Sequence, residues 1–486
     1  MTLLMLLEMV ASAFGDRCAI GTRATGLTYE QLLARAGAGA EVLRRQGARH
    51  LAFIGGSDAA FPVALFASTW AWVPFLPLNY RLRDEQLAGL LSNHDDVLVV
   101  ADDPARFAGM GSAVLGVEEW AAATAEPVEA APSTTDGEDI AILLYTSGTT
   151  AAPKAVVLRH RHLTSYVVGS VEFAGADEAE ATLVSVPPYH IAGVANAVSN
   201  VYAARRIVYL PGFSPEGWLD TVRSEGITHA MVVPTMLARV VEHLGADADA
   251  GCTGLRSLAY GGARMPVTVL ERALSAFPGT DFVNAYGLTE TSSTIAVLGP
   301  DDHRAAMSGD EVARARLGSA GRLVPGIEVE IRDDEIWVRG EQVSGEYLGL
   351  AGSLDADGWF PTRDRGWVDD DGYLFIEGRT DDTIIRGGEN IAPAEIEDVL
   401  LTHPAVLQAA VVGVPDEEWG QRLAAAVVCR PGVTVGAAEL QAYARERLRS
   451  SKTPDLIAFR DELPHTDTGK LLRRAVLADL EKEALR

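Results

Sequence analysis

The stretch LYTSGTTAAPK, residues 144–154, is the most informative part of this chain. The apolar run that leads into it, residues 140–145, is typical of a buried strand. The loop that follows offers backbone N–H groups, small hydroxyl groups and the ammonium of Lys154, which together suit a polyanion. Its spacing differs from the common P-loop, because no second glycine follows Gly148. Ligands bind where strands end in open α/β sheets, so we expect a triphosphate site here. The expected phosphate-binding residues are Thr146, Ser147, Gly148, Thr149, Thr150 and Lys154.

Length, charge and cysteine content limit the classes of protein to which the chain can belong. Its 486 residues suit two or three packed units, and its net charge of −26 argues against nucleic acid as a partner. The three cysteines, Cys18, Cys252 and Cys429, lie far apart and predict neither a disulfide framework nor a zinc site. We therefore expect a reducing, cytoplasmic location. Residues 1–14 lack a basic region and predict an amphipathic helix, and no segment predicts an integral membrane span.

The hydrophobic pattern changes along the chain and predicts the fold class. Helical periodicity alternates with short β-branched runs, which indicates a large α/β domain of layered subdomains over residues 1–380. Within it, residues of about 318–378 predict a β-rich subdomain. Residues 381–486 predict a small, mobile α+β domain, so we place the boundary at residues 379–382. The segment 104–139 is rich in Ala, Pro, Asp and Glu, and we expect a surface connection without direct function.

A second motif, YGLTE at residues 286–290, combines an aromatic ring, a glycine, a hydroxyl group and a carboxylate. Such a set can stack on a base, approach a phosphate and hold a cation. It also fits a plain loop in which Thr289 caps a helix and Glu290 lies in the first turn. Upstream, YGGA at residues 260–263 has paired glycines that allow the backbone to approach a flat ligand, or simply to turn.

Three further segments follow in the C-terminal third. In TRD, residues 362–364, the carboxylate of Asp364 can accept hydrogen bonds from both hydroxyls of a diol. The segment 378–391 carries Arg379 and a glycine pair that also fits a hairpin turn. Near the end, Lys470 follows the segment PHTDTG and can stabilise negative charge if it reaches a reacting phosphate.

Together these motifs resemble the adenylate-forming (AMP-binding) superfamily, which includes acyl-CoA synthetases, adenylation domains of peptide synthetases and luciferases. The similarity runs from about residue 27 to residue 474 and is greatest to the acyl-CoA synthetase, or fatty-acid–CoA ligase, branch. It implies that ATP and Mg²⁺ activate a fatty, aromatic or polycyclic carboxylic acid to an acyl-adenylate. It further implies that coenzyme A then takes the acyl group, in a protein that is a monomer or a homodimer.

The resemblance implies a role for each motif in binding ATP. Tyr286 would lie against adenine, Thr289 on the α-phosphate and Glu290 on Mg²⁺. Asp364 would bind the ribose hydroxyls, and Lys470 would be the adenylation lysine. The implied catalytic residues are Lys154, Thr289, Glu290 and Lys470. The implied ATP site comprises Thr146, Ser147, Gly148, Thr149, Thr150, Lys154, Gly262, Ala263, Tyr286, Gly287, Thr289, Asp364, Arg379 and Lys470.

For the second step, the resemblance implies that the C-terminal domain rotates about a hinge at Asp381. The rotation would carry Lys470 away and bring the Gly387–Gly388 side to the adenylate, so that a thiol can attack. The segment 187–193 would line the acyl pocket together with one glycine of the YGGA motif. The implied acyl- and coenzyme A-binding residues are Tyr189, His190, Gly193, Gly261, Gly387 and Gly388.

The sequence departs from this family at several positions. Relatives normally have glycine at positions 151 and 155, where alanine would be strained if φ were positive, and glycine where Arg363 stands. Ser214 occupies a place where amino-acid-activating relatives carry an aspartate, which argues against an amino-acid substrate. Two alternatives stay open: an adenylating enzyme that loads a carrier protein, and a nucleotide-binding paralogue with weak catalysis.

Overall fold

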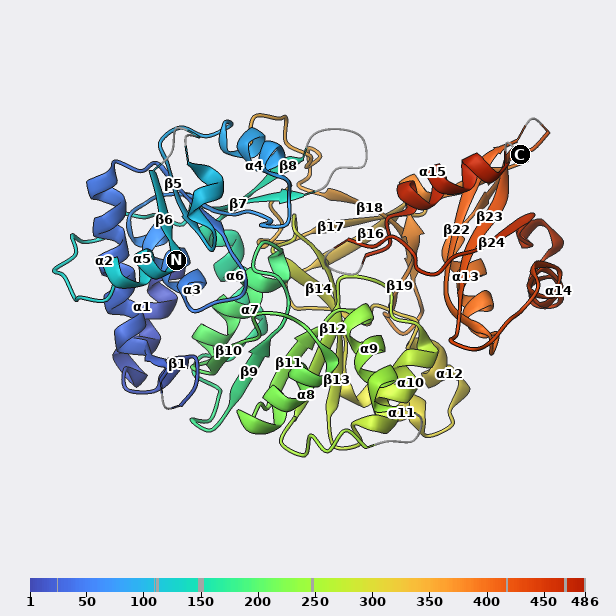
Figure 1. Ribbon diagram of the computed structural model, residues 1–486, viewed down its shortest axis with the longest axis horizontal. Helices are drawn as coiled ribbons and strands as arrows, with labels where there is room; N and C mark the ends of the chain where they lie inside the picture. The colour runs from blue at the N-terminus through green and yellow to red at the C-terminus, as the bar shows by residue number, and fades with distance from the viewer. Residues whose placement is uncertain are drawn as a thin grey trace.

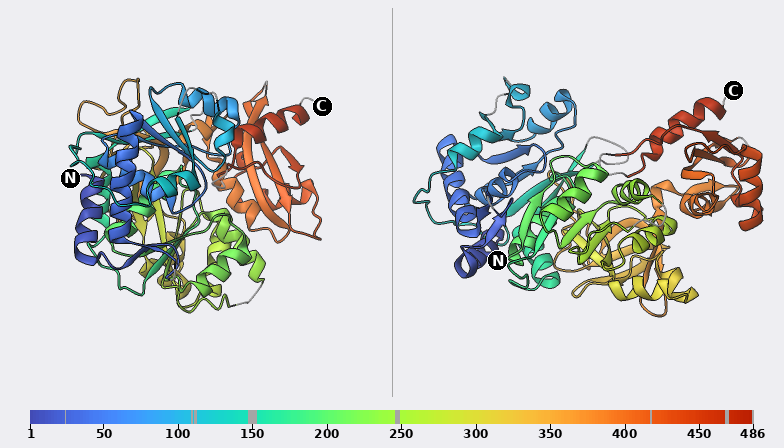
Figure 2. Two further views of the ribbon diagram at one scale, coloured as in Figure 1. Left: turned by 60° about the vertical axis from the view of Figure 1, so that its left-hand side comes forward. Right: turned by 60° about the horizontal axis from the view of Figure 1, so that its bottom comes forward.

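A computed structural model describes residues 1–23, 25–108, 110, 113–146, 153–245, 249–416, 418–466 and 470–484. Two α/β sheets form the larger body and share a layer of helices, and a smaller unit projects from this body (Figures 1 and 2). The model thus has the expected α/β architecture with a large N-terminal and a smaller C-terminal domain. Among the residues described, no helix has the length and apolar character needed to cross a bilayer.

The first sheet has six strands in the order β6-β5-β3-β4-β7-β8. All neighbours are parallel except β7 and β8, which form the antiparallel pair on either side of residues 147–152. Because β7 ends at the loop, the expected phosphate-binding segment does follow the carboxyl end of a strand. The strands are β3 (His50–Ile54), β4 (Phe75–Pro77), β5 (Val97–Ala101), β6 (Ala113–Gly116), β7 (Ile140–Thr146) and β8 (Lys154–Arg159).

The second sheet has nine strands in the order β15-β14-β13-β12-β11-β9-β10-β1-β2. Its centre is parallel, whereas β2, β14 and β15 pair antiparallel at the two ends. The carboxyl ends of β12 and β13 therefore lie side by side. The strands are β1 (Cys18–Ile20), β2 (Leu27–Thr28), β9 (Ala181–Val184), β10 (Arg206–Tyr209), β11 (His229–Val232), β12 (Ser257–Gly261), β13 (Asp281–Leu288), β14 (Ser293–Leu298) and β15 (Arg322–Leu323).

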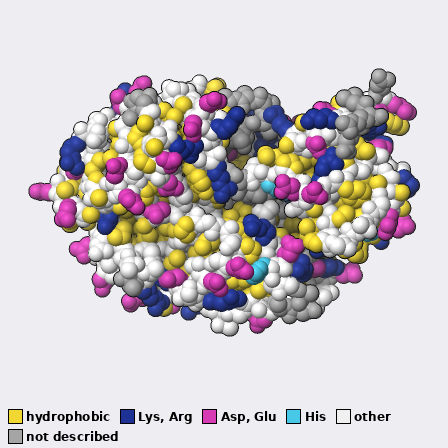
Figure 3. Space-filling model, viewed as in Figure 1, with side chains coloured by type: hydrophobic (Ala, Val, Ile, Leu, Met, Phe, Trp, Pro, Cys, Tyr) yellow, Lys and Arg dark blue, Asp and Glu magenta, His cyan; other side chains and the backbone are white. Residues whose placement is uncertain are grey.

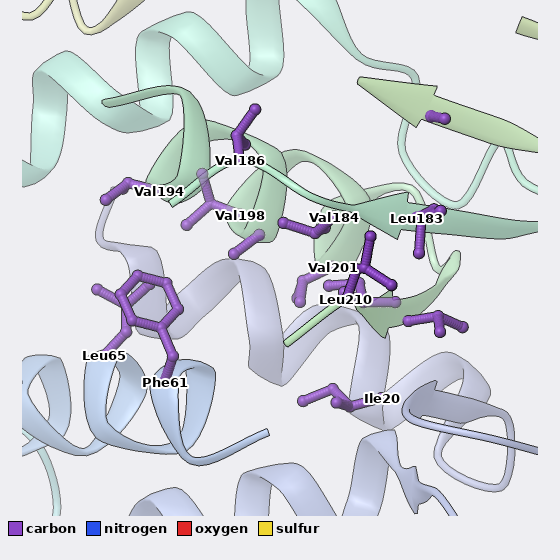
Figure 4. Packing of buried hydrophobic residues seen from close by; sticks show 14 of the residues in the cluster. Ile20, Phe61, Leu65, Leu183, Val184, Val186, Val194, Val198, Val201 and Leu210 are labelled. Carbon is purple, nitrogen blue, oxygen red and sulfur yellow. The ribbon is translucent and has the colours of Figure 1, made fainter. Parts of the chain in front are cut away.

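Helices between the two sheets bury one large apolar cluster. Phe61 and Leu65 of α3 point toward Val194 and Val198 of α7 in this cluster (Figure 4). Burial of such side chains contributes roughly 1.5–3 kcal/mol each, so this layer fixes the two sheets relative to each other. The helices of the larger body are α1 (Leu3–Phe14), α2 (Tyr29–Gln46), α3 (Ala60–Trp70), α4 (Asp84–Leu91), α5 (Val117–Ala123), α6 (His160–Ser170), α7 (Ile191–Tyr202), α8 (Pro215–Ser224), α9 (Pro234–Leu244), α10 (Val267–Ala276), α11 (Pro300–Met307) and α12 (Glu311–Arg316).

The expectation of a plain surface connection over residues 104–139 was wrong. This segment contains the 3₁₀ turn η1 (Pro104–Phe107), strand β6 and helix α5, and β6 forms the edge of the first sheet. Trp120 of α5 is fully buried, so this helix is anchored in the core despite the polar composition of the segment.

The β-rich part is a four-stranded antiparallel sheet, and the smaller unit follows it. Strand β19 ends at Arg379, and the 3₁₀ turn η2 (Thr380–Asp382) occupies the predicted domain boundary. The sheet consists of β16 (Glu328–Arg332), β17 (Glu335–Arg339), β18 (Phe360–Val368) and β19 (Leu374–Arg379). The smaller unit consists of β20 (Ile384–Arg386), β21 (Glu389–Ile391), α13 (Pro393–Leu401), β22 (Val406–Asp416), β23 (Gly420–Cys429), α14 (Ala437–Arg447), η3 (Ser450–Lys452), β24 (Leu456–Phe459) and α15 (Arg473–Ala484).

Candidate active site

The site lies between the larger body and the smaller unit, where Figure 3 shows a hollow with Lys and Arg side chains along its rim. Thr146 and Lys154 are paired residues of β7 and β8 at the base of the phosphate loop. The predicted residues Ser147, Gly148, Thr149 and Thr150 lie outside the described part of the chain, as does residue 151. Ala155 pairs with Tyr145 inside β8 and has no positive φ, so this position does not need glycine.

Strand β13 delivers Tyr286 to a buried carboxylate on β18. The Tyr286 hydroxyl donates to Asp364 Oδ2 at 2.6 Å, and Arg379 Nη1 donates to Asp364 Oδ1 at 3.1 Å. Asp364 is 5% exposed, and it pairs directly with Arg379 across β18 and β19. Burial raises the pKa of the Asp364 carboxyl, whereas the charge of Arg379 and the hydrogen bond from Tyr286 lower it. The Asp364 carboxylate therefore already accepts hydrogen bonds, as it would from the hydroxyl groups of a ribose.

Glu290 is the last residue of the YGLTE motif. It contacts Tyr347, which the sequence analysis did not identify as a site residue. The Tyr347 hydroxyl donates to Glu290 Oε1 at 2.8 Å, and Lys154 Nζ lies 5.5 Å from the centroid of the Tyr347 ring. Tyr347 belongs to a segment bonded to β8, since Leu348 N donates to Ala155 O. Tyr347 thus joins the expected metal-binding carboxylate to the expected phosphate-binding ammonium. No cluster of three or more metal-binding side chains occurs among the described residues, but one carboxylate beside phosphates suits Mg²⁺.

The backbone after Glu290 is strained. Ser292 has φ 55° and Ser293 has φ 114°, values that side-chain-bearing residues rarely adopt. A Cβ at Gly287 would lie 1.7 Å from Ser293 O, so only glycine permits this approach. The amide of buried Gln342 donates to Thr291 O at 2.9 Å and to Thr294 O at 2.8 Å. Gln342 therefore clamps the strained loop that follows the motif.

Lys470 enters the site from the smaller unit. Its backbone N donates to Thr466 Oγ1 at 3.0 Å, and the chain between these two residues lies outside the described part. Partial burial of the ammonium and the nearby charge of Arg379 lower the pKa of Lys470, whereas Asp364 and Asp382 raise it. The charges of Asp364 and Arg379 therefore act on the Lys470 ammonium, although Lys470 belongs to the smaller unit.

The predicted acyl-binding residues lie at the carboxyl ends of the second sheet and beside α7. Tyr189 is buried, its ring contacts that of Tyr80 at 5.7 Å between centroids, and His190 precedes the first turn of α7. A Cβ at Gly193 would lie 2.4 Å from Pro187 O, so this glycine is needed for packing. A Cβ at Gly261 would lie 2.2 Å from a backbone oxygen of the adjacent strand, which shows an equally close approach.

Comparison with known proteins identifies the family. The model of AMP-binding enzymes matches residues 7–348, and that of the AMP-binding enzyme C-terminal domain matches residues 395–470. The chain belongs to the AMP-binding enzyme family. A fatty acid–acyl-carrier-protein ligase, ScoC of Streptomyces coeruleorubidus, is 32% identical over 92% of this chain and 90% of its own length. A feruloyl-CoA synthase from Amycolatopsis is 33% identical over 93% of this chain and 94% of its own length.

A solved structure of an AMP-binding enzyme also matches almost the whole chain. o-Succinylbenzoate CoA synthetase of Bacillus subtilis, in complex with its acyl-adenylate intermediate, aligns with a TM-score of 0.84 and 29% identity. The alignment covers 97% of both chains. Family and fold therefore agree with the resemblance read from the motifs.

Three other predicted residues of this AMP-binding enzyme lie in the smaller unit or in the turn that leads into it. Gly387 and Gly388, with φ 57° and 84°, form the turn of the β20–β21 hairpin. Gly387 N donates to Trp419 O at 2.8 Å, so the described contacts of this turn lie within the smaller unit. Asp381, the predicted hinge, lies in η2 between the two units.

One ion pair crosses from the larger body to the smaller unit and was not foreseen. Arg264 follows the YGGA motif, and its guanidinium binds the carboxylate of Asp398 on α13. Burial raises the pKa of Asp398 to about 6, although the charge of Arg264 opposes this shift. No sequence motif connects these two residues, because 134 positions separate them along the chain.

Proposed function

We propose that this chain activates a carboxylic acid whose remainder is fatty, aromatic or polycyclic and carries no ammonium group. The chain is an AMP-forming acid–thiol ligase: it uses ATP and Mg²⁺ to form an acyl-adenylate and transfers the acyl group to coenzyme A. The observation that carries this function is the buried Asp364 carboxylate, which accepts hydrogen bonds from Tyr286 and Arg379 and whose charge acts on Lys470 of the smaller unit. A single site of this kind can position a nucleotide and a carboxylate together.

The residue roles that we propose are those that the family resemblance implies, and the contacts around Asp364 and Glu290 support them. Asp364 binds the ribose hydroxyls, and Tyr286 forms the wall for adenine. Lys154 and Thr146 meet the polyphosphate, and Glu290 holds Mg²⁺, which neutralises phosphate charge when bound. Lys470 stabilises the charge that develops as the carboxylate attacks the α-phosphorus.

No protein nucleophile is needed for adenylation, because the substrate carboxylate already carries the negative charge. The charge of Asp364 acts on the Lys470 ammonium, which supports the arrangement that performs the first step. In the second step the smaller unit rotates at Asp381, so that the Gly387–Gly388 turn replaces Lys470 beside the adenylate. The attacking thiol forms the thioester bond as the bond between the acyl carbon and AMP breaks.

The surroundings of Ser214 support an acid without an ammonium group. The Ser214 hydroxyl accepts a hydrogen bond from Gly217 N at 3.1 Å, as the N-cap of α8, and is thus already engaged. Next to it, the guanidinium of Arg239 lies 5.2 Å from the centroid of the Phe213 ring. A cation at this place would repel a substrate ammonium.

We also propose a cytoplasmic protein, a monomer or homodimer, with no nucleic-acid partner and no integral membrane association. The net charge of −26 supports the exclusion of nucleic acid. A carrier protein is the second candidate acceptor, because ScoC is named a ligase for an acyl-carrier protein.

Pyrophosphate release from ATP and Mg²⁺ tests the function, with a panel of fatty, aromatic and polycyclic acids and the same mixtures without acid. We expect release that requires acid and rises when coenzyme A is added, together with free acyl-CoA as product. Release with acid that coenzyme A leaves unchanged would indicate a carrier protein. ATP binding without release for any acid would contradict the enzymatic proposal and favour the nucleotide-binding paralogue.

A further inference from the structure

A short segment, residues 344–348, joins the first sheet to the YGLTE motif. On one side it runs along β8, the edge strand of the sheet, where Leu348 N donates to Ala155 O at 2.9 Å. On the other side, Ser344 N donates to Glu290 O at 2.8 Å. The segment is therefore bonded both to the strand that follows the phosphate loop and to the last residue of the motif.

Tyr347 is the residue of this segment whose side chain contacts both groups. Its hydroxyl donates to Glu290 Oε1 at 2.8 Å, and Lys154 Nζ lies 5.5 Å from the centroid of its ring. The other carboxylate oxygen, Glu290 Oε2, accepts no hydrogen bond within the described part of the chain. A hydroxyl that donates to one oxygen fixes the orientation of a carboxylate and leaves the second oxygen to a cation.

Tyr373 makes contacts of the same kind elsewhere in the larger body, and the comparison shows what is particular to Glu290. The Tyr373 hydroxyl donates to Asp302 Oδ1 at 2.6 Å, and the guanidinium of Arg316 lies 4.4 Å from the centroid of its ring. The second oxygen of Asp302 is also engaged, because Gly299 N donates to Oδ2 at 3.2 Å. Both oxygens of Asp302 thus serve the fold, whereas one oxygen of Glu290 stays available to a ligand.

We propose that Tyr347 is a positioning residue that acts on the metal site and the phosphate site together. Its hydroxyl holds Glu290 so that one carboxylate oxygen is left for Mg²⁺, and its ring stabilises the Lys154 ammonium that meets the polyphosphate. This inference rests on the proposed function, because it assumes that Glu290 holds Mg²⁺ and that Lys154 binds ATP. A residue that hydrogen-bonds a metal ligand contributes about 10- to 100-fold to metal affinity, and a cation over an exposed ring contributes about two- to fivefold.

Binding of nucleotides to the full chain tests this role without acid or turnover. Tyr347→Phe removes the hydroxyl and keeps the ring, and Tyr347→Leu removes both. Tyr373→Phe is the matched control, because it loses a hydrogen bond to a carboxylate at the amino end of β19, whereas Arg379 ends that strand. Calorimetry measures the affinity for ATP with saturating Mg²⁺, for ATP with EDTA, and for AMP with EDTA. The ratio of the two ATP affinities gives the contribution of the metal, and unfolding temperatures are recorded for each variant.

We expect Tyr347→Phe to lower this ratio about tenfold and to leave the two affinities in EDTA unchanged. Tyr347→Leu should lower the ratio as much and also weaken ATP binding in EDTA by about two- to fivefold, since the ring beneath Lys154 is gone. Tyr373→Phe should change none of the three affinities.

An unchanged ratio in Tyr347→Phe would overturn the role, as would an equal fall in Tyr373→Phe or equal losses for ATP and AMP. If the unaltered chain bound ATP equally well with Mg²⁺ and with EDTA, the metal role of Glu290 would be wrong and this role with it. No ATP binding by the unaltered chain would instead overturn the proposed function itself.

Discussion

Replacing Gln342 by leucine should slow adenylation by the folded protein in addition to lowering its stability. Leucine keeps a similar volume but removes the amide that donates to Thr291 O and Thr294 O at 2.9 and 2.8 Å. Gln342 is 6% exposed, so both carbonyls would be left without a donor in a dry environment. At about 1–3 kcal/mol for each of the two unsatisfied groups, the free energy of unfolding should fall by about 2–6 kcal/mol.

The expected effect on catalysis arises because the hydrogen bonds of Gln342 stabilise a strained backbone conformation next to the motif. Ser292 and Ser293, at φ 55° and 114°, each store roughly 1–3 kcal/mol that can relax once the clamp is gone. Relaxation would shift Thr289 and Glu290, which only Thr291 separates from these residues. A displacement near 1 Å at a reacting group costs about 10²-fold in rate, and we expect a loss of that order in the adenylation step.

The assay is acid-dependent exchange of pyrophosphate into ATP, at a temperature where urea denaturation shows every variant to be folded. Thr228→Val is the matched control. Thr228 is 8% exposed, and its hydroxyl donates to Ala181 O at 3.0 Å and accepts from Ala181 N at 3.1 Å. Thr228 directly precedes β11 and thus lies at the amino end of this strand, whereas the site lies at the carboxyl ends of the strands. Equal exchange rates in the two variants at equal loss of stability would refute the positioning role of Gln342.

Three further outcomes follow from the contacts of the site. Asp398→Asn should slow adenylation by about 1.5- to 5-fold through loss of the partly exposed pair with Arg264, and leave thioester formation unchanged. Because burial raises the pKa of Asp398 to about 6, the unaltered chain loses the same charge as pH falls, and the two rates should converge below pH 6. Gly193→Ala places a Cβ 2.4 Å from Pro187 O, so denaturation should show about 1–3 kcal/mol less stability, and KM should rise for the acid but not for ATP. Asp364→Asn should weaken AMP and ATP binding equally and abolish the preference for AMP over 2′-deoxy-AMP in calorimetry.

The parts of the site that the sequence predicted are those in which neighbouring residues act together. The motif at residues 286–290 lies at the end of strand β13, and the Gly387–Gly388 pair forms the turn of one hairpin, so local spacing was enough to select them as candidates. The α/β class was predictable for the same reason, because each strand and helix has its own hydrophobic period.

The residues that sequence reasoning missed act across large separations. Tyr347 contacts Glu290 from 57 positions away, and Gln342 contacts Thr291 from 51 positions away. Neither lies in a motif, so only the folded chain connects them to the reaction. The segment 104–139 was misread because its polar composition concealed one anchor, Trp120, whose burial orders the helix around it.

The central claim is that one site with Lys470 from the smaller unit performs the adenylation step. Its most direct test measures the two half-reactions separately for Lys470→Ala, with Lys482→Ala of α15 as the control. We predict that Lys470→Ala loses formation of the acyl-adenylate from acid and ATP by about 10²-fold or more, in line with loss of one transition-state contact. It should still convert supplied acyl-adenylate and coenzyme A to the thioester at the rate of the unaltered chain. An equal loss in both half-reactions, or in neither, would contradict the account.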